Sequence, residues 1–224
     1  MPRLPPVAVA YHAVHEPEPG VDAPDVIDPP EALERDVRAL QAAGYRIVTA
    51  GQVVVETGGA RPADGTAVLT FDDGWRDGLT VAGPLLARLG VRGTFFVCPG
   101  LFGNHDPRMG EAGHMLAGPG EARALHELGM ELGAHSLHHP DLRALGDAEL
   151  RRELAGSREA VEAIAGEPCR TLAYPFGVHD ARVRKAARAA GFALAFQYAP
   201  GRWSPFAAPR VPAPWCPAAA IMGS

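Results

Sequence analysis

The sequence predicts an α/β fold in which about seven parallel strands form a distorted barrel surrounded by helices. Short apolar runs alternate with segments of helical periodicity along most of the 224 residues, and this alternation is typical of a parallel sheet. Polar, reactive side chains directly follow several of these runs, as they do at the carboxyl ends of barrel strands. This order and length favour a barrel over an open sheet, and we expect residues 1–224 to form a single domain.

The expected strands are short apolar runs bounded by glycine, proline or polar residues. They span, in chain order, residues 7–10, 46–48, 67–71, 93–97, 130–134, 171–173 and 192–196. The run at 67–71 is typical of a buried strand, and it ends abruptly in two carboxylates and a glycine. We assign no element to the apolar segment at 53–55 or to the proline-rich tail beyond residue 196.

The segments between these strands show the apolar spacing of amphipathic helices. The first begins at the run 28–31 and ends at Gly44, and the others span residues 79–89, 121–128, 147–165 and 180–190. In the first of them, Leu33, Val37 and Leu40 lie on one face, and Gly44 ends the helix. The run Asp-Pro-Pro-Glu at 28–31 resembles a capping box with proline at the first helical position.

Composition excludes several classes of function. The chain is 47% hydrophobic and 21% charged, with a formal net charge of −5, and without basic runs it gives no reason to expect nucleic acid as a partner. No apolar run approaches the length of a membrane span, and the N-terminal apolar stretch is too short for a signal peptide. We therefore expect a cytoplasmic protein, while a trimmed leader would leave export open.

The three cysteines, Cys98, Cys169 and Cys216, lie far apart in the sequence. An odd number without a C-x-x-C pair excludes a complete disulfide framework and a cysteine zinc ribbon. We expect buried free thiols. The sequence gives no indication of the oligomeric state.

Asp72 and Asp73 follow the run at 67–71 and precede Gly74. Adjacent residues of a strand point to opposite faces, but both carboxylates can enter one site where the strand stops and the chain turns. One can then hold a metal ion while the other handles protons. Further on, His135 and His139 offer imidazoles at a four-residue spacing, and an aspartate with two histidines is an open three-ligand set suited to a catalytic metal. These residues indicate a metal-dependent hydrolase.

Three motifs resemble those of the NodB-type polysaccharide deacetylases, carbohydrate esterase family 4. Residues 70–74, Thr-Phe-Asp-Asp-Gly, resemble the first motif, and residues 133–140 contain the H-S-x-x-H core of the second. Residues 172–177, Leu-Ala-Tyr-Pro-Phe-Gly, resemble the third. The resemblance extends over residues 7–210, nearly the whole chain, and it implies a distorted barrel of seven strands.

The resemblance also implies a role for each motif residue. Asp73, His135 and His139 would be the metal ligands, and Asp72 would be the general base that deprotonates the attacking water. The backbone N–H of Phe176, where the family usually has tyrosine, would help hold the oxyanion. Two histidines and one carboxylate suit Zn²⁺, our expected metal, and also Co²⁺, Ni²⁺ or Fe²⁺.

Two departures from the family pattern concern groups around this centre. The usual third motif has an arginine where this chain has Ala173, and Arg210 is our candidate to replace it. The usual general acid is a late histidine, but no histidine follows His179. We therefore expect His12, at the end of the first strand, to be the acid, as in permuted members that supply this histidine early. The candidate substrate-binding residues are Trp75, Tyr174, Pro175 and Arg210.

Together these features predict a metal-dependent deacetylase that removes N-acetyl groups from an amino-sugar poly- or oligosaccharide. An O-acetyl esterase for xylan-like chains would use the same centre, and a hydrolase of cyclic amides or ureides is a further alternative at the level of the family. A sugar-binding protein without turnover would keep the fold and the metal. The arginine missing at Ala173 is the feature that favours this last alternative.

Overall fold

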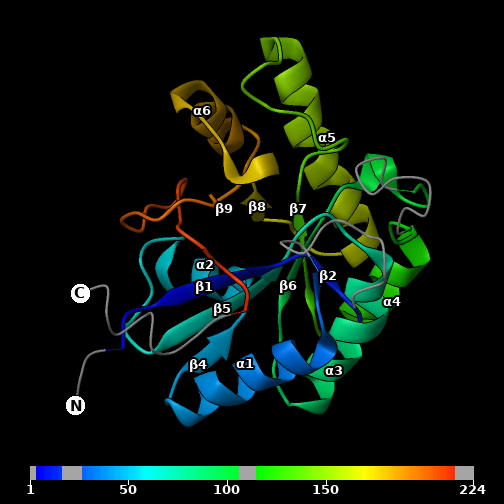
Figure 1. The fold of residues 1–224 in the computed structure, drawn as a ribbon. Helices are drawn as coiled ribbons and strands as arrows, with labels where there is room; N and C mark the ends of the chain where they lie inside the picture. Colours follow the sequence, from blue (N-terminus) through cyan, green and yellow to red (C-terminus); the bar gives the residue numbers. More distant parts are fainter. Residues whose placement is uncertain (1–3, 17–26, 106–114, 215–224) are drawn as a thin grey trace.

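The main sheet of the computed structural model is parallel throughout and curls into a distorted barrel (Figure 1). The structure describes residues 4–16, 27–105 and 115–214. The strand order is β10-β1-β5-β6-β7-β8-β9, and β4 pairs with the first half of β5. The strands are β1 Val7–Tyr11, β4 Arg46–Val48, β5 Thr66–Phe71, β6 Thr94–Val97, β7 Glu131–Ala134, β8 Thr171–Ala173, β9 Leu194–Phe196 and β10 Val211–Pro212. The predicted fold class is confirmed.

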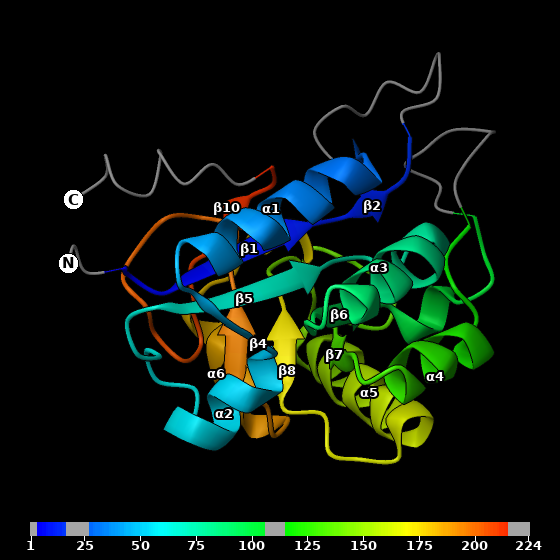
Figure 2. The same cartoon turned by 90° about the horizontal axis from the view of Figure 1, so that it is seen from below.

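The helices other than α2 (Ala50–Thr57) cover the outer face of this sheet. They are α1 Pro30–Ala42, α3 Gly83–Arg88, α4 Pro119–Glu127, α5 Asp147–Ala165 and α6 Ala181–Ala189, with a π-helical turn at Gly78–Ala82. Helix α1 packs beside α3, while α4 and α5 pack on β7 (Figure 2). Among the described residues, no helix is long and apolar enough to cross a membrane. Cys98 and Cys169 are buried free thiols, as expected, and Cys216 lies outside the described residues.

Helix α2 fills the end of the barrel at which the strands begin. Its Val53 and Val54 belong to the inner apolar cluster that also contains Val68 and Phe96. The N–H of Ala50, at the start of this helix, donates to Thr94 Oγ1 (2.8 Å) at the start of β6. The apolar segment at 53–55 is therefore part of a plug and not a strand.

A short segment around residue 210 closes the barrel between β9 and β1. Ala208 forms a parallel bridge with Phe196 of β9, and β10 pairs with β1, where Val211 lies opposite Val9. This segment thus joins the last strand of the barrel to the first. Arg210 lies between the two pairings, and its side chain is buried.

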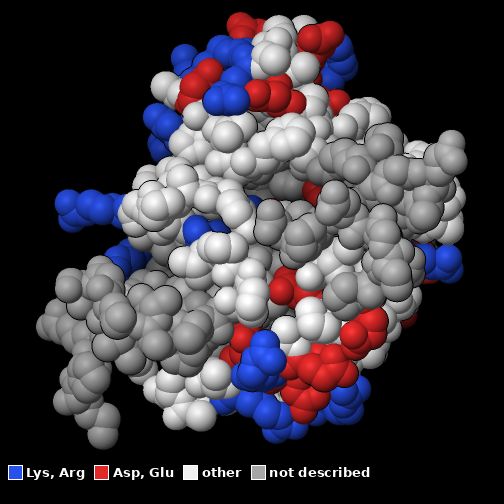
Figure 3. Space-filling model, in the orientation of Figure 1, with Lys and Arg blue, Asp and Glu red and all other residues white. Residues whose placement is uncertain are grey.

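Exposed charges of both signs lie side by side on the face drawn in Figure 3, over α5 and α6 and over α1. Several of them form pairs, such as Arg182 with Asp147 (3.0 Å) across α6 and α5, and Arg38 with Glu34 (2.6 Å) within α1. Exposed pairs of this kind each contribute roughly 0–1 kcal/mol. This face therefore shows no extended area of a single charge sign among the described residues.

The start of α1 corrects the sequence prediction. Pro29 is the N-cap and no side chain caps the helix, so the expected capping box at 28–31 does not form. Asp28 belongs instead to β3 (Ile27–Asp28), which pairs with β2 (Ala13–Val14). Burial, together with the charge of Asp36, raises the pKa of Asp28 to about 6. The fold therefore favours the neutral form of this carboxyl.

Replacing Asp28 by Asn should stabilise the protein more at pH 8 than at pH 4. A carboxyl whose pKa is raised in the folded state lowers stability progressively as pH rises from about 4 to about 6. With a discount for solvent screening, the ionised form costs about 1–2 kcal/mol. Urea unfolding of both proteins at the two pH values measures this difference, and an equal difference at both pH values would contradict it.

Glu131 links the beginnings of three neighbouring strands and α2. Its Oε2 accepts hydrogen bonds from the N–H of Gly51 (2.7 Å) and from Thr94 Oγ1 (2.8 Å). Its Oε1 accepts a third from Thr171 Oγ1 (2.7 Å) at the start of β8. Burial raises the pKa of Glu131, and these hydrogen bonds oppose that shift. The carboxylate therefore acts as a shared acceptor at this end of the barrel.

Replacing Glu131 by Ala should lower the free energy of unfolding by about 1–3 kcal/mol, because a buried N–H and two hydroxyls lose their acceptor. Urea denaturation measures the loss. Glu127→Ala, which removes an exposed carboxylate at the end of α4, is the matched control and should change stability by less than about 0.5 kcal/mol. Equal losses in both variants would disprove the linking role.

Candidate active site

Strand β5 directs Asp72 into the barrel. Thr70 faces the interior, where its Oγ1 accepts a hydrogen bond from Arg210 (3.1 Å), and the alternation of the strand continues to Asp72. At Asp73 the backbone then enters the left-handed region, with φ of 72°, and Gly74 follows with φ of 79°. A Cβ at Gly74 would lie only 3.2 Å from a methyl group of Val97, so this turn favours glycine. The turn lets both carboxylates serve one site.

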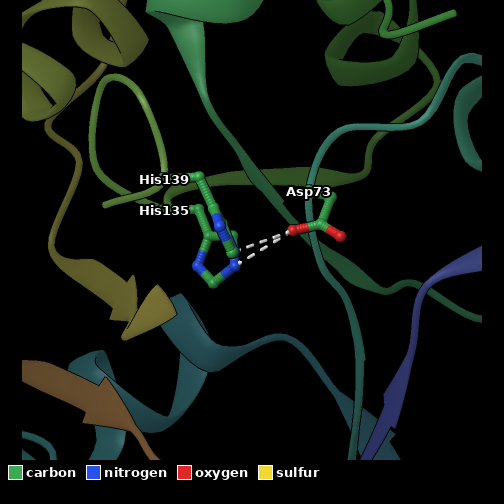
Figure 4. A group of neighbouring side chains, drawn as sticks. All are labelled: Asp73, His135 and His139. Carbon is green, nitrogen blue, oxygen red and sulfur yellow. Dashed lines mark ion pairs between the residues drawn. The ribbon is translucent and has the colours of Figure 1, made fainter. Parts of the chain in front are cut away.

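Asp73, His135 and His139 form a compact, buried group of ligand atoms (Figure 4). Asp73 Oδ1 lies 3.4 Å from Nε2 of His135 and 3.2 Å from Nε2 of His139. One ligand atom from each residue lies within 4.8 Å of the other two. Two imidazole nitrogens and one carboxylate oxygen match the donor set of a catalytic zinc site, which keeps a further position open. The three residues therefore fit a single divalent cation.

Hydrogen bonds outside this group orient the ligands. His135 Nδ1 lies 2.7 Å from the carbonyl oxygen of Ala173. Because a carbonyl only accepts, Nδ1 carries the proton and Nε2 presents its lone pair to the ligand group. Trp75 donates its Nε1–H to Asp73 Oδ2 (3.0 Å), and Ser136 Oγ accepts from the N–H of His139 (3.0 Å).

Asp72 forms a bidentate ion pair with Arg210. Two guanidinium nitrogens each lie 2.6 Å from one carboxylate oxygen, and the two side chains are 4% and 0% exposed. Burial alone would raise the pKa of Asp72, but the charge and hydrogen bonds of Arg210 hold it below its ordinary value. Asp72 therefore contacts a guanidinium although position 173 is alanine.

His12 lies at the same rim as Asp72. The pairing of β1 with β5 places Tyr11 opposite Phe71, so the next residues, His12 and Asp72, leave their strands side by side. The ring of His12 is partly buried, 5.9 Å from that of Tyr198. Burial lowers the pKa of His12, and the nearby carboxylates of Asp72 and Asp73 act in the opposite direction.

The other predicted residues differ in exposure. The ring of Phe176 lies 4.6 Å from that of His139 and is 57% exposed. The four candidate substrate-binding residues, Trp75, Tyr174, Pro175 and Arg210, are all buried. Tyr174 donates its hydroxyl to the carbonyl of Phe206 (3.2 Å) and fills the core. Trp75 contacts Asp73 and Arg210 contacts Asp72, so these two lie beside the candidate ligand group.

Backbone strain is concentrated in the three motif loops. Among the described residues, four that are not glycine have positive φ, and all four lie in these loops: Asp73, Ser136, His139 and Phe176. Such conformations each cost of order 1–3 kcal/mol and cluster at functional sites. The strain supports the location of the site independently of the ligand distances.

Comparison with known families agrees with this location. The sequence model described as polysaccharide deacetylase matches residues 59–195, which is more than half of the chain. The chain belongs to the polysaccharide deacetylase family. The matched region contains the Asp72-Asp73 pair, His135, His139 and the loop at 174–177.

Two curated proteins of Bacillus subtilis (strain 168) are similar to this deacetylase-family chain. The peptidoglycan-N-acetylmuramic acid deacetylase PdaA is 32% identical over 137 residues, which are 58% of this chain and 46% of PdaA. YxkH is 24% identical over 174 residues, which are 77% of this chain and 59% of YxkH. The chain thus spans about half to three-fifths of the length of these relatives.

Solved structures share the fold. The Streptococcus pyogenes deacetylase PplD, solved in complex with acetate, is similar with a TM-score of 0.77 and 21% identity over 94% of this chain and 92% of PplD. IcaB from Ammonifex degensii is similar with a TM-score of 0.76 and 20% identity over 97% of this chain and 94% of IcaB. At identities of 20–21%, these similarities establish only that the chain shares the distorted-barrel fold of these structures.

Sequence reasoning missed two residues beside the site. Tyr198 lies just after β9, and its N–H donates to the carbonyl of Gly177 (3.3 Å). The approach is so close that a Cβ on Gly177 would collide with the Cβ of Tyr198. Tyr198 also lines a cavity of about 660 Å³, together with residues of β3, α1 and β10. Glu153 of α5 binds the loop between the ligand histidines. Neither residue lies in a motif, and no local pattern marks them.

Replacing Arg210 by Met in the metal-free protein should lower the free energy of unfolding by about 3–5 kcal/mol, because Asp72 would be left as a buried, unpaired charge. The double variant Arg210→Met/Asp72→Asn should recover most of this loss, since it removes both charges. Urea denaturation of the two variants and of Asp72→Asn completes the cycle. Additive losses would show that the two side chains do not depend on each other.

Proposed function

We propose that this member of the polysaccharide deacetylase family is a metal-dependent hydrolase that removes N-acetyl groups from an amino-sugar substrate. The observation that carries the proposal is the buried Asp73–His135–His139 group with the ionised carboxylate of Asp72 beside it. The similarity to a peptidoglycan-N-acetylmuramic acid deacetylase supports an acetylated amino sugar.

We assign Asp73, His135 and His139 as the ligands of one divalent ion, with Zn²⁺ first and Co²⁺, Ni²⁺ or Fe²⁺ as alternatives. When bound, such an ion would lower the pKa of a bound water to about 7 and would polarise the acetyl carbonyl. The hydrogen bond of His135 to the carbonyl of Ala173 and that of Trp75 to Asp73 hold the ligands in position for it.

Asp72 is the proposed general base, which takes a proton from the attacking water. Both of its oxygens contact Arg210, which holds the carboxylate ionised and fixes its plane. We therefore assign Arg210 to the positioning of Asp72 and not to substrate binding. This contact also weakens the case for a sugar-binding protein without turnover, since that alternative depended on the arginine missing at Ala173.

His12 is the proposed general acid, because it lies beside Asp72 at the rim and is partly exposed toward solvent. It would donate a proton to the departing amine nitrogen. The backbone N–H of Phe176 is the proposed donor to the oxyanion of the tetrahedral intermediate. A donor of this kind is worth about 3–4 kcal/mol in transition-state stabilisation.

Replacing Asp72 by Asn should lower the rate of acetate release from chitooligosaccharides by about 10²–10⁴-fold, the usual contribution of a general base. Metal content, measured by mass spectrometry, should stay near that of the unmodified protein. Replacing His135 by Ala should remove both metal and activity. Normal turnover by the Asn variant would exclude Asp72 as the base.

The same assay separates the alternative substrates. Rates on N-acetylated chitooligosaccharides and on O-acetylated xylan, each before and after chelation, compare the deacetylase with the esterase. Faster release from xylan would favour the esterase, and metal without release from either would favour a different acyl substrate or a binding role. A protein that takes up no Zn²⁺ would contradict the ligand assignment.

A further inference from the structure

The loop that carries the two ligand histidines needs support from outside itself. It runs from His135, at the end of β7, to His139, and its backbone is strained at Ser136 (φ 64°) and at His139 (φ 56°). Such conformations persist only where surrounding structure holds them. The rings of the two histidines lie 4.9 Å apart, so the path of this loop sets the geometry of the ligand group.

Glu153 of α5 binds the middle of this loop through both carboxylate oxygens. Its Oε2 accepts hydrogen bonds from the N–H groups of Leu137 (2.8 Å) and His138 (3.0 Å). Its Oε1 accepts a third from Nδ1 of His138 (2.8 Å). The side chain of Glu153 is largely buried, whereas that of His138 is 56% exposed. One carboxylate therefore holds both residues that lie between Ser136 and His139.

Two glycines allow neighbouring elements to pack closely against both sides of the loop. A Cβ at Gly156, one turn after Glu153 on α5, would lie 2.7 Å from a methyl group of Leu137. On the other side, the N–H of Gly100 donates to the carbonyl of Leu137 (3.0 Å), and a Cβ at Gly100 would collide with the ring of His138. The loop is thus clamped between α5 and the turn at Pro99–Leu101.

We propose that Glu153 is a positioning residue for the metal ligands, acting through the backbone of Leu137 and His138. Without its carboxylate, the strained loop would sample other paths, and ordering it again would oppose metal binding. The inference rests on the proposed function, because it concerns the affinity of the same metal site. Loss of partners that orient metal ligands typically weakens metal binding by about 10–100-fold.

The test compares Glu153→Met with Glu153→Gln. The two side chains have nearly the same length, but Met cannot accept hydrogen bonds, whereas Gln keeps one oxygen for the two backbone N–H groups. Zn²⁺ affinity, measured by competition with a chromophoric chelator, should fall by about 10–100-fold in the Met variant and recover to within about threefold in the Gln variant. Glu159→Met, an exposed position on the same helix, is the matched control and should bind Zn²⁺ normally.

Thermal unfolding of the metal-free proteins separates positioning from general destabilisation. The Glu153→Met variant should unfold at a lower temperature than Glu159→Met, because three donors lose their acceptor. Zn²⁺ affinity is therefore measured well below both transitions, where global unfolding does not contribute to the loss. Unchanged Zn²⁺ affinity in the Met variant, or equal loss in the Met and Gln variants, would overturn the inference. If the starting protein binds no Zn²⁺, the proposed function fails instead.

A measurement on the unmodified metal-free protein covers the case in which the Met variant does not fold. The backbone amides of Leu137 and His138 should exchange hydrogen slowly, because both donate to the largely buried carboxylate of Glu153. Exchange at the rate of an open loop would show that Glu153 does not hold these residues, and would overturn the inference without any variant.

Discussion

The ion pair between Asp72 and Arg210 is the interaction on which the rest of the site depends. It joins residues 138 positions apart in the sequence, one at the end of β5 and one in the segment that closes the barrel. A buried pair of this kind contributes little net stability, because desolvation offsets its attraction. Its effect is specific instead: it holds a carboxylate charged inside an apolar barrel, beside the ligand group.

The strands of the barrel determine where the site residues lie, and the loops that follow them determine how the side chains are oriented. Parallel pairing fixes where each strand ends, and so brings His12, Asp72 and His135 to one rim. The loops then depart from ordinary backbone geometry to turn the ligands inward, at a cost that the apolar clusters of the barrel and its helices offset. A rigid scaffold with strained ends is a general way to hold groups in a reactive arrangement.

The order of strands and helices was predictable because it rests on local apolar periodicity, and the ligand group because its residues lie in short motifs. The plug α2 escaped prediction, since a few consecutive apolar residues at 53–55 do not distinguish a helix from a strand. The sequence offers Arg210 as a candidate partner of Asp72, and no local pattern marks Glu153. Both contacts join positions that only the closed barrel brings together. The predicted capping box at 28–31 is wrong because the helix begins one residue later, with Pro29 as its N-cap and Asp28 in β3.

The place of Arg210 has a consequence for the order of events during synthesis. Synthesis proceeds from the N-terminus, so residue 210 is added after all three motifs. Asp72, His135 and His139 all emerge from the ribosome before residue 210 does. The segment that bridges β9 and β1, and the guanidinium that pairs with Asp72, cannot form their contacts before that residue is made. The nascent chain therefore contains Asp73, His135 and His139 before it contains the guanidinium that pairs with Asp72.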